Sequence, residues 1–599
     1  MVADDLVTFV KNDLLYFGVG VLIFLIITLK LIFRELRWIL LPIICCVFSV
    51  IATSGFLGMF TWEVTVISSN FISIQIIITM ALTIHLTVRY RELIVNNPET
   101  DHRQLILDSV TSMALPCTYA ILTTCAGFGS LILSDILPVI NFGWMMSVGI
   151  FVSLFLTFLI FPVILVLMPK VHPNISFGSN FALTTVLAKT TEKNGTIILV
   201  ISFLLLVFSG IGALQLRVEN SFIDYFKDST EIYQGMKVID QQLGGTTPLD
   251  IVIDFDSPAE AGVTVASANV ENNSATESKG VEQNEDDVFD DFEEEFEASK
   301  NEAQYWFTED KMNQVEKVHD YLESFPEVGK VLSLGTLLKV GKTLNEGEPL
   351  DNFMLALVYN KLPEEFRNII LSPFVSVDNN QVRLTTRVID SDPNLRRNEL
   401  LIKIRHDLTH KLGIDADKVH LASLLVLYNN MLQSLFDSQI LTLGAVLVVL
   451  MGMFLILFRS VKISIIAILP NALSVGVVLG FMGWANIPLD LMTITIAAIS
   501  VGIAVDDTIH YIHRFEVEFA KDSNYLASMH RCHGSIGHAM YYTSVTIIIG
   551  FSILVLSNFI PSIYFGLLTG LAMLIALIAA LTLLPQLIIF MKPFGLERS

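Results

Sequence analysis

Charged residues and cysteines are both scarce in this chain of 599 residues. Only 16% of its residues are charged, whereas soluble domains carry about 25%. Hydrophobic residues make up 53%, which is more than a soluble core can bury, so a membrane is the natural solvent for the chain. The five cysteines include no Cys-x-x-Cys pair, and none lies in the long polar stretch, which argues against a disulfide framework or a zinc cage.

Basic residues are outnumbered as well, because 37 Lys and Arg stand against 59 Asp and Glu, for a formal net charge of -22. Ten of the acids fall between Glu282 and Glu297, so the acidity is partly a local feature and identifies no partner. Nothing in this balance favours binding to nucleic acid. The N-terminal segment, Met1–Asp13, is polar and acidic, which is not the pattern of a signal peptide.

Eleven apolar stretches are each long enough to cross a bilayer, which takes roughly 20 residues. They run over residues 14–33, 38–60, 66–88, 112–133, 142–168, 196–214, 439–458, 462–485, 489–512, 540–558 and 563–590. We therefore expect a polytopic α-helical membrane protein. Its expected parts are a first transmembrane block (1–169), a cytoplasmic linker (170–195), a leading helix (196–214), an extracytoplasmic domain (215–437) and a second transmembrane block (438–599).

The distribution of Lys and Arg predicts the orientation of the spans. Basic residues gather in one set of loops, which includes Arg34, Arg89, Arg459 and Arg514. The short loops on the other side contain none; these lie near residues 61–66, 135–141, 485–490 and 558–562. Because basic loops stay in the cytoplasm, we expect the C-terminus inside, and the N-terminus and the 217–435 domain outside.

The two five-helix blocks are related in sequence. Leu122–Pro169 aligns with Val545–Lys592 without a gap, and Thr83-Ile84-His85 aligns with Thr508-Ile509-His510. Both copies have the same predicted orientation, so the duplication is parallel, about an axis along the membrane normal. Only the second copy has a leading helix and an outside domain before its block. We therefore expect that a first helix and a first outside domain are missing, through a fragment, a mis-assigned start or a natural shortening.

The outside domain is predicted to be mixed α/β. Leu249–Phe255 and Val382–Ile389 alternate like strands, whereas Glu309–Phe325 and Asn398–Leu412 have helical periodicity. An acidic insert at about 257–303 should be disordered, because it cannot bury enough apolar surface to offset its conformational entropy.

The strongest chemical signal is the run Gly502-Ile503-Ala504-Val505-Asp506-Asp507 in the ninth span. A carboxyl in a spanning segment costs roughly 2.5–3.5 kcal/mol on insertion scales, so an adjacent pair indicates a function. Such a pair can bind and release a proton, as a pump requires. His510 lies one turn after Asp506 on the same face. The competing interpretation is that the pair is solvated near the cytoplasmic interface, since Arg514 follows within about two turns.

These features together resemble a known superfamily. Gly-x-x-x-Asp-Asp at 502–507, the one-plus-five helix grouping and the large outside domain resemble the resistance–nodulation–division (RND) superfamily. The chain is most similar to its single-chain lipid-exporter branch, the MMPL type, which is related to Patched, Dispatched and sterol-sensing five-helix blocks. The resemblance covers essentially the whole chain. It implies a porter-like outside domain and a proton relay at Asp506 and Asp507, with Gly502 as the motif glycine.

The first repeat departs from the family pattern, in which both repeats often carry acids. Ala81 and Leu82 stand at the positions of Asp506 and Asp507, so we expect any proton path to be asymmetric and to run through the second repeat alone. Relay partners are expected among polar residues of neighbouring helices, with ordinary helix–helix hydrogen bonding as the alternative role. The candidates are His510, Tyr541, Tyr542, Thr543, Ser544, Thr79 and Thr83. Asn70 and Gln75 make the third span polar and could line a water or substrate path, or join helices by hydrogen bonds.

The remaining sequence patterns give weaker evidence of function. The run Gly335–Thr343 resembles a phosphate loop but has five residues between its glycines instead of four, so ATP-driven transport has no support. His406 and His410 have zinc-compatible spacing without a third ligand, which favours a solvated helix face. A predicted cytoplasmic loop holds four further residues that could bind a metal, but without the spacing of a familiar site: His530, Cys532, His533 and His538. The acidic tract is interpreted as a solvating linker rather than a calcium site, and no resident metal is predicted.

The sequence thus predicts a secondary transporter rather than an enzyme. It would sit in a bacterial inner membrane and couple inward proton flow to outward movement of a hydrophobic or amphiphilic molecule, with a lipid as the leading substrate. The proton is the coupling ion, and no other cofactor is expected. The bilayer and the substrate are its expected partners, with a homo-oligomer and a periplasmic partner left open. The alternatives are a non-transporting lipid sensor or scaffold on the same fold, or an inactive fragment of a larger transporter.

Overall fold

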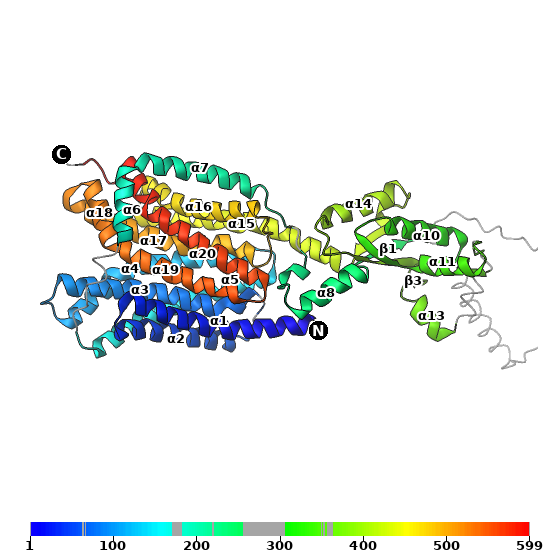
Figure 1. Ribbon diagram of the computed structural model, residues 1–599, viewed down its shortest axis with the longest axis horizontal. Coiled ribbons are helices and arrows are strands. Elements are labelled where there is room, and N and C mark those ends of the chain that lie inside the picture. Colours follow the sequence, from blue (N-terminus) through cyan, green and yellow to red (C-terminus); the bar gives the residue numbers. More distant parts are fainter. Residues whose placement is uncertain are drawn as a thin grey trace, which may run out of the picture. The chain divides into compact units, whose positions relative to one another are not determined.

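The computed structural model describes residues 2–62, 65, 67–170, 182–218, 221–255, 306–348, 350, 351, 354, 355 and 363–597. The chain divides into two compact units (Figure 1). The first contains Met1–Asn220, Asp224–Ile232 and Met431–Ser599, and the second contains Ser221–Ile223 and Tyr233–Asn430. The acidic tract and the segment predicted to be disordered lie outside the described residues.

Eleven helical segments of the described chain are long and apolar enough to cross a membrane. They are α1 (Val2–Phe33), α2 (Leu36–Met59), α3 (Phe71–Asn96), α4 (His102–Ser130), α5 (Leu137–Leu167), α7 (Gly195–Ala213), α15 (Leu424–Phe458), α16 (Val461–Trp484), α17 (Thr493–Asp522), α19 (Ile536–Ser552), and α20 (Ile560–Leu581) continued by α21 (Leu583–Met591). Each predicted apolar stretch corresponds to one of them, so the predicted polytopic helical fold is confirmed.

The sequence repeat is also a repeat of side-chain packing. A Cβ atom at Gly143 of α5 would lie 2.7 Å from the carbonyl oxygen of Phe128, and one at Gly566 of α20 would lie 2.5 Å from that of Phe551. The neighbouring ring pairs, Phe128–Phe142 and Phe551–Phe565, both have centroids 5.8 Å apart. Glycine at both positions lets backbones approach closely, as is usual between membrane helices.

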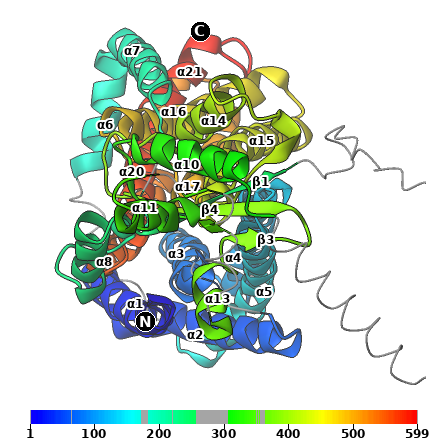
Figure 2. The same cartoon turned by 90° about the vertical axis from the view of Figure 1, so that its right-hand side faces the viewer.

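Helices α3 and α17 are the counterparts at the centre of the first unit. Buried residues make up 89% and 94% of their most apolar windows, more than in any other described span. Figure 2 shows α3 beside α1, α2, α4 and α5, and α17 packs against α4, α16, α19 and α20. α17 crosses α4 closely, because a Cβ atom at Gly127 would lie 2.7 Å from Ala498 O and 3.0 Å from Gly502 Cα. This crossing fixes α17 against a helix of the first repeat.

One loop prediction is wrong. His530, Cys532 and His533 lie in a helix, α18 (Tyr525–Gly534), and Cys532 is buried. Both ring nitrogens of His533 lie 2.9 Å from backbone carbonyl oxygens, those of Met529 and Leu581. The carbonyl of Leu581 is available because Pro585, four residues on, has no N–H to bond it and bends the chain between α20 and α21. The polar residues of this segment suggest a loop, because an amphipathic helix has a low mean hydropathy.

The second unit contains a five-stranded antiparallel sheet in the order β2-β4-β1-β5, with β3 paired to β4. The strands are β1 (Thr247–Asp254), β2 (Val328–Leu332), β3 (Val375–Ser376), β4 (Gln381–Val388) and β5 (Val419–Ala422). Helices α10 (Glu309–Glu323), α11 (Leu334–Leu344) and α14 (Arg397–His410) share one core with Leu249, Ile251 and Ile253 of β1, so they cover one face of the sheet. The two strands and two helices predicted from periodicity are confirmed. His406 and His410 stack on α14 with ring centroids 4.3 Å apart.

Candidate functional site

The start of α17 is fixed by a buried acid. Asp490 Oδ1 accepts the backbone N–H groups of Met492 and Thr493, each at 2.8 Å, and its own N–H donates to Thr493 Oγ1 at 2.7 Å. These bonds satisfy groups that a helix terminus leaves open. Burial raises the pKa of the Asp490 carboxyl to about 6. Burial also raises the pKa of Asp13, which accepts a hydrogen bond from Ser557 Oγ at 2.7 Å.

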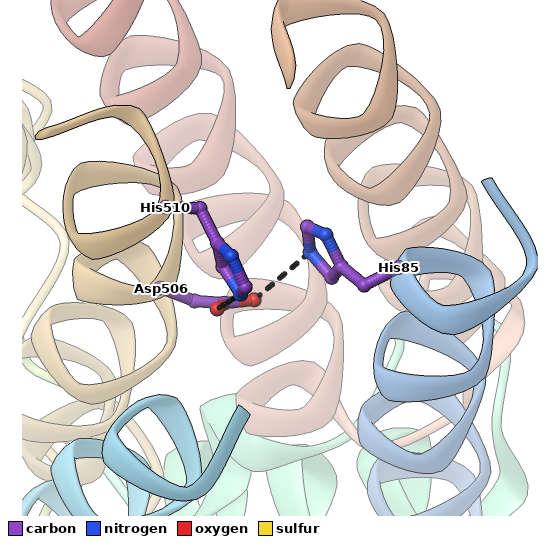
Figure 3. Close-up of side chains that lie close together, drawn as sticks. All are labelled: His85, Asp506 and His510. Carbon is purple, nitrogen blue, oxygen red and sulfur yellow. Dashed lines mark ion pairs between the residues drawn. The ribbon is translucent and has the colours of Figure 1, made fainter. Parts of the chain in front are cut away.

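About four turns further along α17, Asp506 lies between two histidines. His510 Nε2 is 3.0 Å from Asp506 Oδ1, and His85 Nε2 is 3.3 Å from Asp506 Oδ2. Figure 3 shows His85 approaching from α3, while Asp506 and His510 both project from α17. Both imidazoles are almost fully buried, at 2% and 3% exposure. One carboxylate therefore contacts a histidine from each repeat.

The two histidines are themselves counterparts in the repeat. Their rings stack with centroids 4.3 Å apart and an angle of 11° between planes. Side chains related by the duplication can meet only where the two repeats face each other, so the stack marks the pseudo-symmetry axis between α3 and α17. The chain is asymmetric one turn away, since Ala81 stands opposite Asp506.

The polar atoms of this cluster lack aligned hydrogen-bond partners. Among the described residues, neither ring nitrogen of His85 has one, nor do His510 Nε2 and Asp506 Oδ1. A buried polar atom without a partner costs about 1–3 kcal/mol, and a water molecule beside these atoms would reduce that cost. A cavity of about 30 Å³ adjoins it, lined by all three residues together with Ala81 and Cys117. That volume is enough for a water molecule.

Asp507 faces a different neighbour. Its carboxylate Oδ2 accepts a hydrogen bond from Ser544 Oγ of α19 at 2.8 Å, and the side chain is buried, at 3% exposure. The predicted pairing of Asp507 with α19 is therefore present for Ser544. Thr543 instead donates back to carbonyl oxygens of its own helix. The Tyr542 ring packs on Phe33 and on its neighbour Tyr541.

The two threonines predicted on α3 lie elsewhere. Thr83 Oγ1 donates to carbonyl oxygens of its own helix, those of Thr79 and Met80. Thr79 Oγ1 lies 2.9 Å from Ser153 Oγ, within a polar cluster around Gln75. There Gln75 Nε2 donates to Gly149 O at 2.6 Å and to Ser49 Oγ at 3.0 Å, and it also contacts Ser153. This cluster joins α3 to α2 and α5 by hydrogen bonds within the first repeat.

His85 is not among the candidate residues predicted from the sequence. His85 aligns with His510, but the relay partners predicted on neighbouring helices all bear hydroxyl groups, and the path is predicted to run through the second repeat alone. The contact of His85 with Asp506 brings a first-repeat side chain to this site, and the route of the proton stays a prediction. The signal was present, because a histidine in a spanning segment is rare and marks function, and its counterpart was already a candidate.

The same three residues have the spacing of a metal site. Their ligand atoms all lie within 4.8 Å of one another, the only such group of three or more among the described residues. Two imidazole nitrogens and a carboxylate oxygen are a donor set that several transition ions accept. A metal ion and a proton would compete for these atoms, so the metal content of the purified protein bears directly on the site's chemistry.

Comparison with known proteins finds solved structures with the same fold. Similar solved structures are the hedgehog release protein Disp from the water bear Hypsibius dujardini and SecDF, a translocon-associated membrane protein from Thermus thermophilus. Disp matches with a TM-score of 0.60 at 14% identity, over 97% of this chain and 71% of its own. SecDF matches with a TM-score of 0.55 at 12% identity, over 98% and 62%. At these identities the likeness shows the fold alone.

A sequence relative and a family model add to this. A curated membrane protein of Methanocaldococcus jannaschii is 31% identical over 153 residues, which are 26% of this chain and 39% of that protein. The match thus spans less than two thirds of the relative's length. The model of the MMPL family matches residues 1–179 and 273–598, most of the chain. The predicted resemblance is confirmed, and the chain belongs to the MMPL family.

Proposed function

We propose that this chain is a proton-driven exporter, in which proton binding at Asp506 and Asp507 drives outward movement of a hydrophobic or amphiphilic molecule, with lipid as the leading class. The observation that carries the proposal is the contact of the Asp506 carboxylate, which is 19% exposed, with a buried histidine from each repeat, at 3.0 and 3.3 Å. Groups at this distance can exchange a proton directly or through one water molecule. Ionisable groups placed inside a membrane protein mark proton and ion pathways.

Protonation at this place changes the forces between the two repeats. An ionised Asp506 attracts protonated His85 on α3 and His510 on its own helix, whereas a neutral Asp506 does not. The packing of α3 against α17 then has two arrangements with different proton affinities, and proton binding shifts their populations. Asp507 carries the second carboxyl and links α17 to α19 through Ser544.

The cellular setting is part of the same proposal. The basic loops support a cytoplasmic C-terminus, and in this proposal the 217–435 domain lies on the periplasmic side of a bacterial inner membrane. The bilayer and a lipid substrate are the proposed partners, together with a second copy of the chain or a periplasmic protein. Reporter fusions at residue 599 and within the 217–435 domain test the orientation. Both reporters on the same side would contradict it.

Transport by reconstituted vesicles tests the relay. With a pH gradient imposed, efflux of a fluorescent lipid is expected to fall to the background rate in Asp506→Asn and in Asp507→Asn. The matched control is Asp522→Asn at the partly exposed end of the same helix, which should transport like the unaltered protein. Unchanged transport in both Asp506→Asn and Asp507→Asn would refute the relay. Stoichiometric metal in the purified protein, lost in His85→Ala, would also refute it by showing a metal site.

A second candidate is a non-transporting lipid sensor or scaffold. It is favoured by the one-sided acid, since Ala81 stands where Asp506 has its counterpart and lines the same cavity. This candidate predicts lipid binding that does not respond to a pH gradient. Lipid binding measured in vesicles with and without the gradient separates it from the exporter.

A further inference from the structure

A second cavity adjoins the first at the histidine pair. It has a volume of about 120 Å³ and shares His85 and His510 with the smaller cavity that holds Asp506. These are the only two residues common to both linings. The stacked rings therefore stand between the two spaces.

The second cavity has a charged and partly exposed rim. Arg514 Nη2 lies 3.1 Å from Glu92 Oε1, and Arg89 Nη1 lies 2.9 Å from Glu92 Oε2. Their side chains keep 24%, 27% and 23% of their surface exposed, for Arg514, Glu92 and Arg89 in turn. Water can reach charged groups that remain partly exposed, so this cavity communicates with the surroundings at that end of α17.

The smaller cavity has a different character. Apart from the His–Asp cluster, its lining is mostly apolar and includes Ile78, Leu82, Ile121 and Ile547. The titratable groups near Asp506 are His85 on α3, Cys117 on α4, and Asp507 and His510 on α17. The residue that α19 contributes to this lining is apolar. The Asp506 side chain keeps 19% of its surface exposed, whereas His85 and His510 keep 2% and 3%, so the two rings are packed more closely than the carboxylate.

We propose that the stacked rings of His85 and His510 form a gate, so that water and protons reach Asp506 from the Arg514 end of α17 only when the rings part. The barrier itself follows from the two cavities, and its proton step rests on the proposed function. In that step the carboxyl of Asp506 gives its proton to an imidazole nitrogen. The same imidazole then releases a proton to water in the second cavity and returns to its neutral form.

Cys117 offers a reporter inside the gate, because it lines the smaller cavity and is fully buried. The other cysteines are Cys45, Cys46, Cys125 and Cys532, and they are replaced by alanine to leave a single thiol. The purified protein is treated with a small water-soluble methanethiosulfonate, and the labelling rate of Cys117 is followed by mass spectrometry.

His85→Ala should label at least about tenfold faster, since lowering a barrier by about 1.4 kcal/mol already changes a rate by that factor. The matched control is His513→Ala, because His513 lines only the second cavity, and its rate should stay unchanged. If His85→Ala does not fold, His510→Ala removes the other ring and tests the same barrier. A folded variant with the original rate overturns the gate, as does an equal acceleration in His513→Ala.

A further variant separates the barrier from the proton step. His85→Phe keeps a ring in the gap but has no nitrogen to carry a proton, so Cys117 should label as slowly as without the substitution. In vesicles the same variant should lose transport driven by a pH gradient. Unchanged transport would overturn the role of His85 in proton transfer. Should no form of the protein transport at all, the proposed function fails while the labelling rates still decide the gate.

Discussion

The crossing of α4 and α17 makes a prediction that can be worked out from distances. In Gly127→Ala the new Cβ would lie 2.7 Å from Ala498 O and 3.0 Å from Gly502 Cα, whereas ordinary contacts begin at 3.4 Å. Both neighbours are backbone atoms, which cannot rotate away. The helices must therefore separate by roughly 0.5 Å, a gap that forfeits about a quarter of each dispersion contact across it. With the strain of overpacking, the expected loss of stability is about 1–3 kcal/mol.

Two further alanine variants make the test a graded series. In Gly502→Ala the nearest atom would be Gly127 Cα at 3.1 Å, so the loss should be smaller. Gly570 of α20 is buried too, but a Cβ atom there meets nothing within 4 Å, so Gly570→Ala should be neutral or stabilising by up to about 1 kcal/mol. Thermal unfolding in detergent, followed by tryptophan fluorescence, gives the order. A midpoint for Gly127→Ala equal to or above that for Gly570→Ala would refute the reasoning.

Ser544 beside Asp507, and Asp490 at the start of α17, give two shorter predictions. Ser544→Ala removes the hydrogen bond to Asp507 and should lower the free energy of unfolding by about 1–3 kcal/mol. Thr543→Ala is the control and should lower it less, because the Thr543 hydroxyl bonds its own helix. Equal thermal unfolding midpoints for the two variants would contradict this prediction. In the folded protein the pKa of Asp490 is about 6, against 3.8 for the free side chain. Its contribution to stability is therefore fully present below about pH 4 and is lost as the pH rises through 6. The loss is roughly 3 kcal/mol at about 1.4 kcal/mol per pKa unit. Between pH 4 and 7 the thermal unfolding midpoint should depend less on pH in Asp490→Asn than in the unaltered protein. An equal dependence on pH in both would show that Asp490 is not the group responsible.

Hydropathy predicted the spans well but not where the helices end. α3 continues to Asn96 and α17 to Asp522, beyond the predicted ends at 88 and 512. A hydropathy window stops where polar residues begin, since it measures transfer into hydrocarbon. The backbone has no such limit, because each further residue adds a hydrogen bond to the residue four before it. Helix ends outside the apolar region are therefore set by capping groups, which composition does not reveal.

The site was predictable along one helix but not between helices. Asp506 and His510 are four residues apart on α17, so sequence spacing alone placed them together. The partners predicted on α3 lie on the helix that contacts Asp506, but on a different face from His85. Thr83 and His85 are two residues apart and point about 200° from each other, so only one can face Asp506. The rotation of a helix that is buried on all sides leaves no apolar stripe in the sequence, and 89% of the α3 window is buried.

The duplication explains why one carboxylate serves two repeats. His85 and His510 meet at the pseudo-symmetry axis, so a carboxylate one turn away on either helix contacts both rings. An acid at position 81 as well would bring a second negative charge toward the same two imidazoles, and like charges in a poorly solvated space oppose each other's ionisation. Ala81 instead leaves space that belongs to the cavity beside Asp506. The symmetric scaffold thus supplies the two histidines and the close helix contacts, and the difference between Ala81 and Asp506 gives the site its one-sided charge and its room for water.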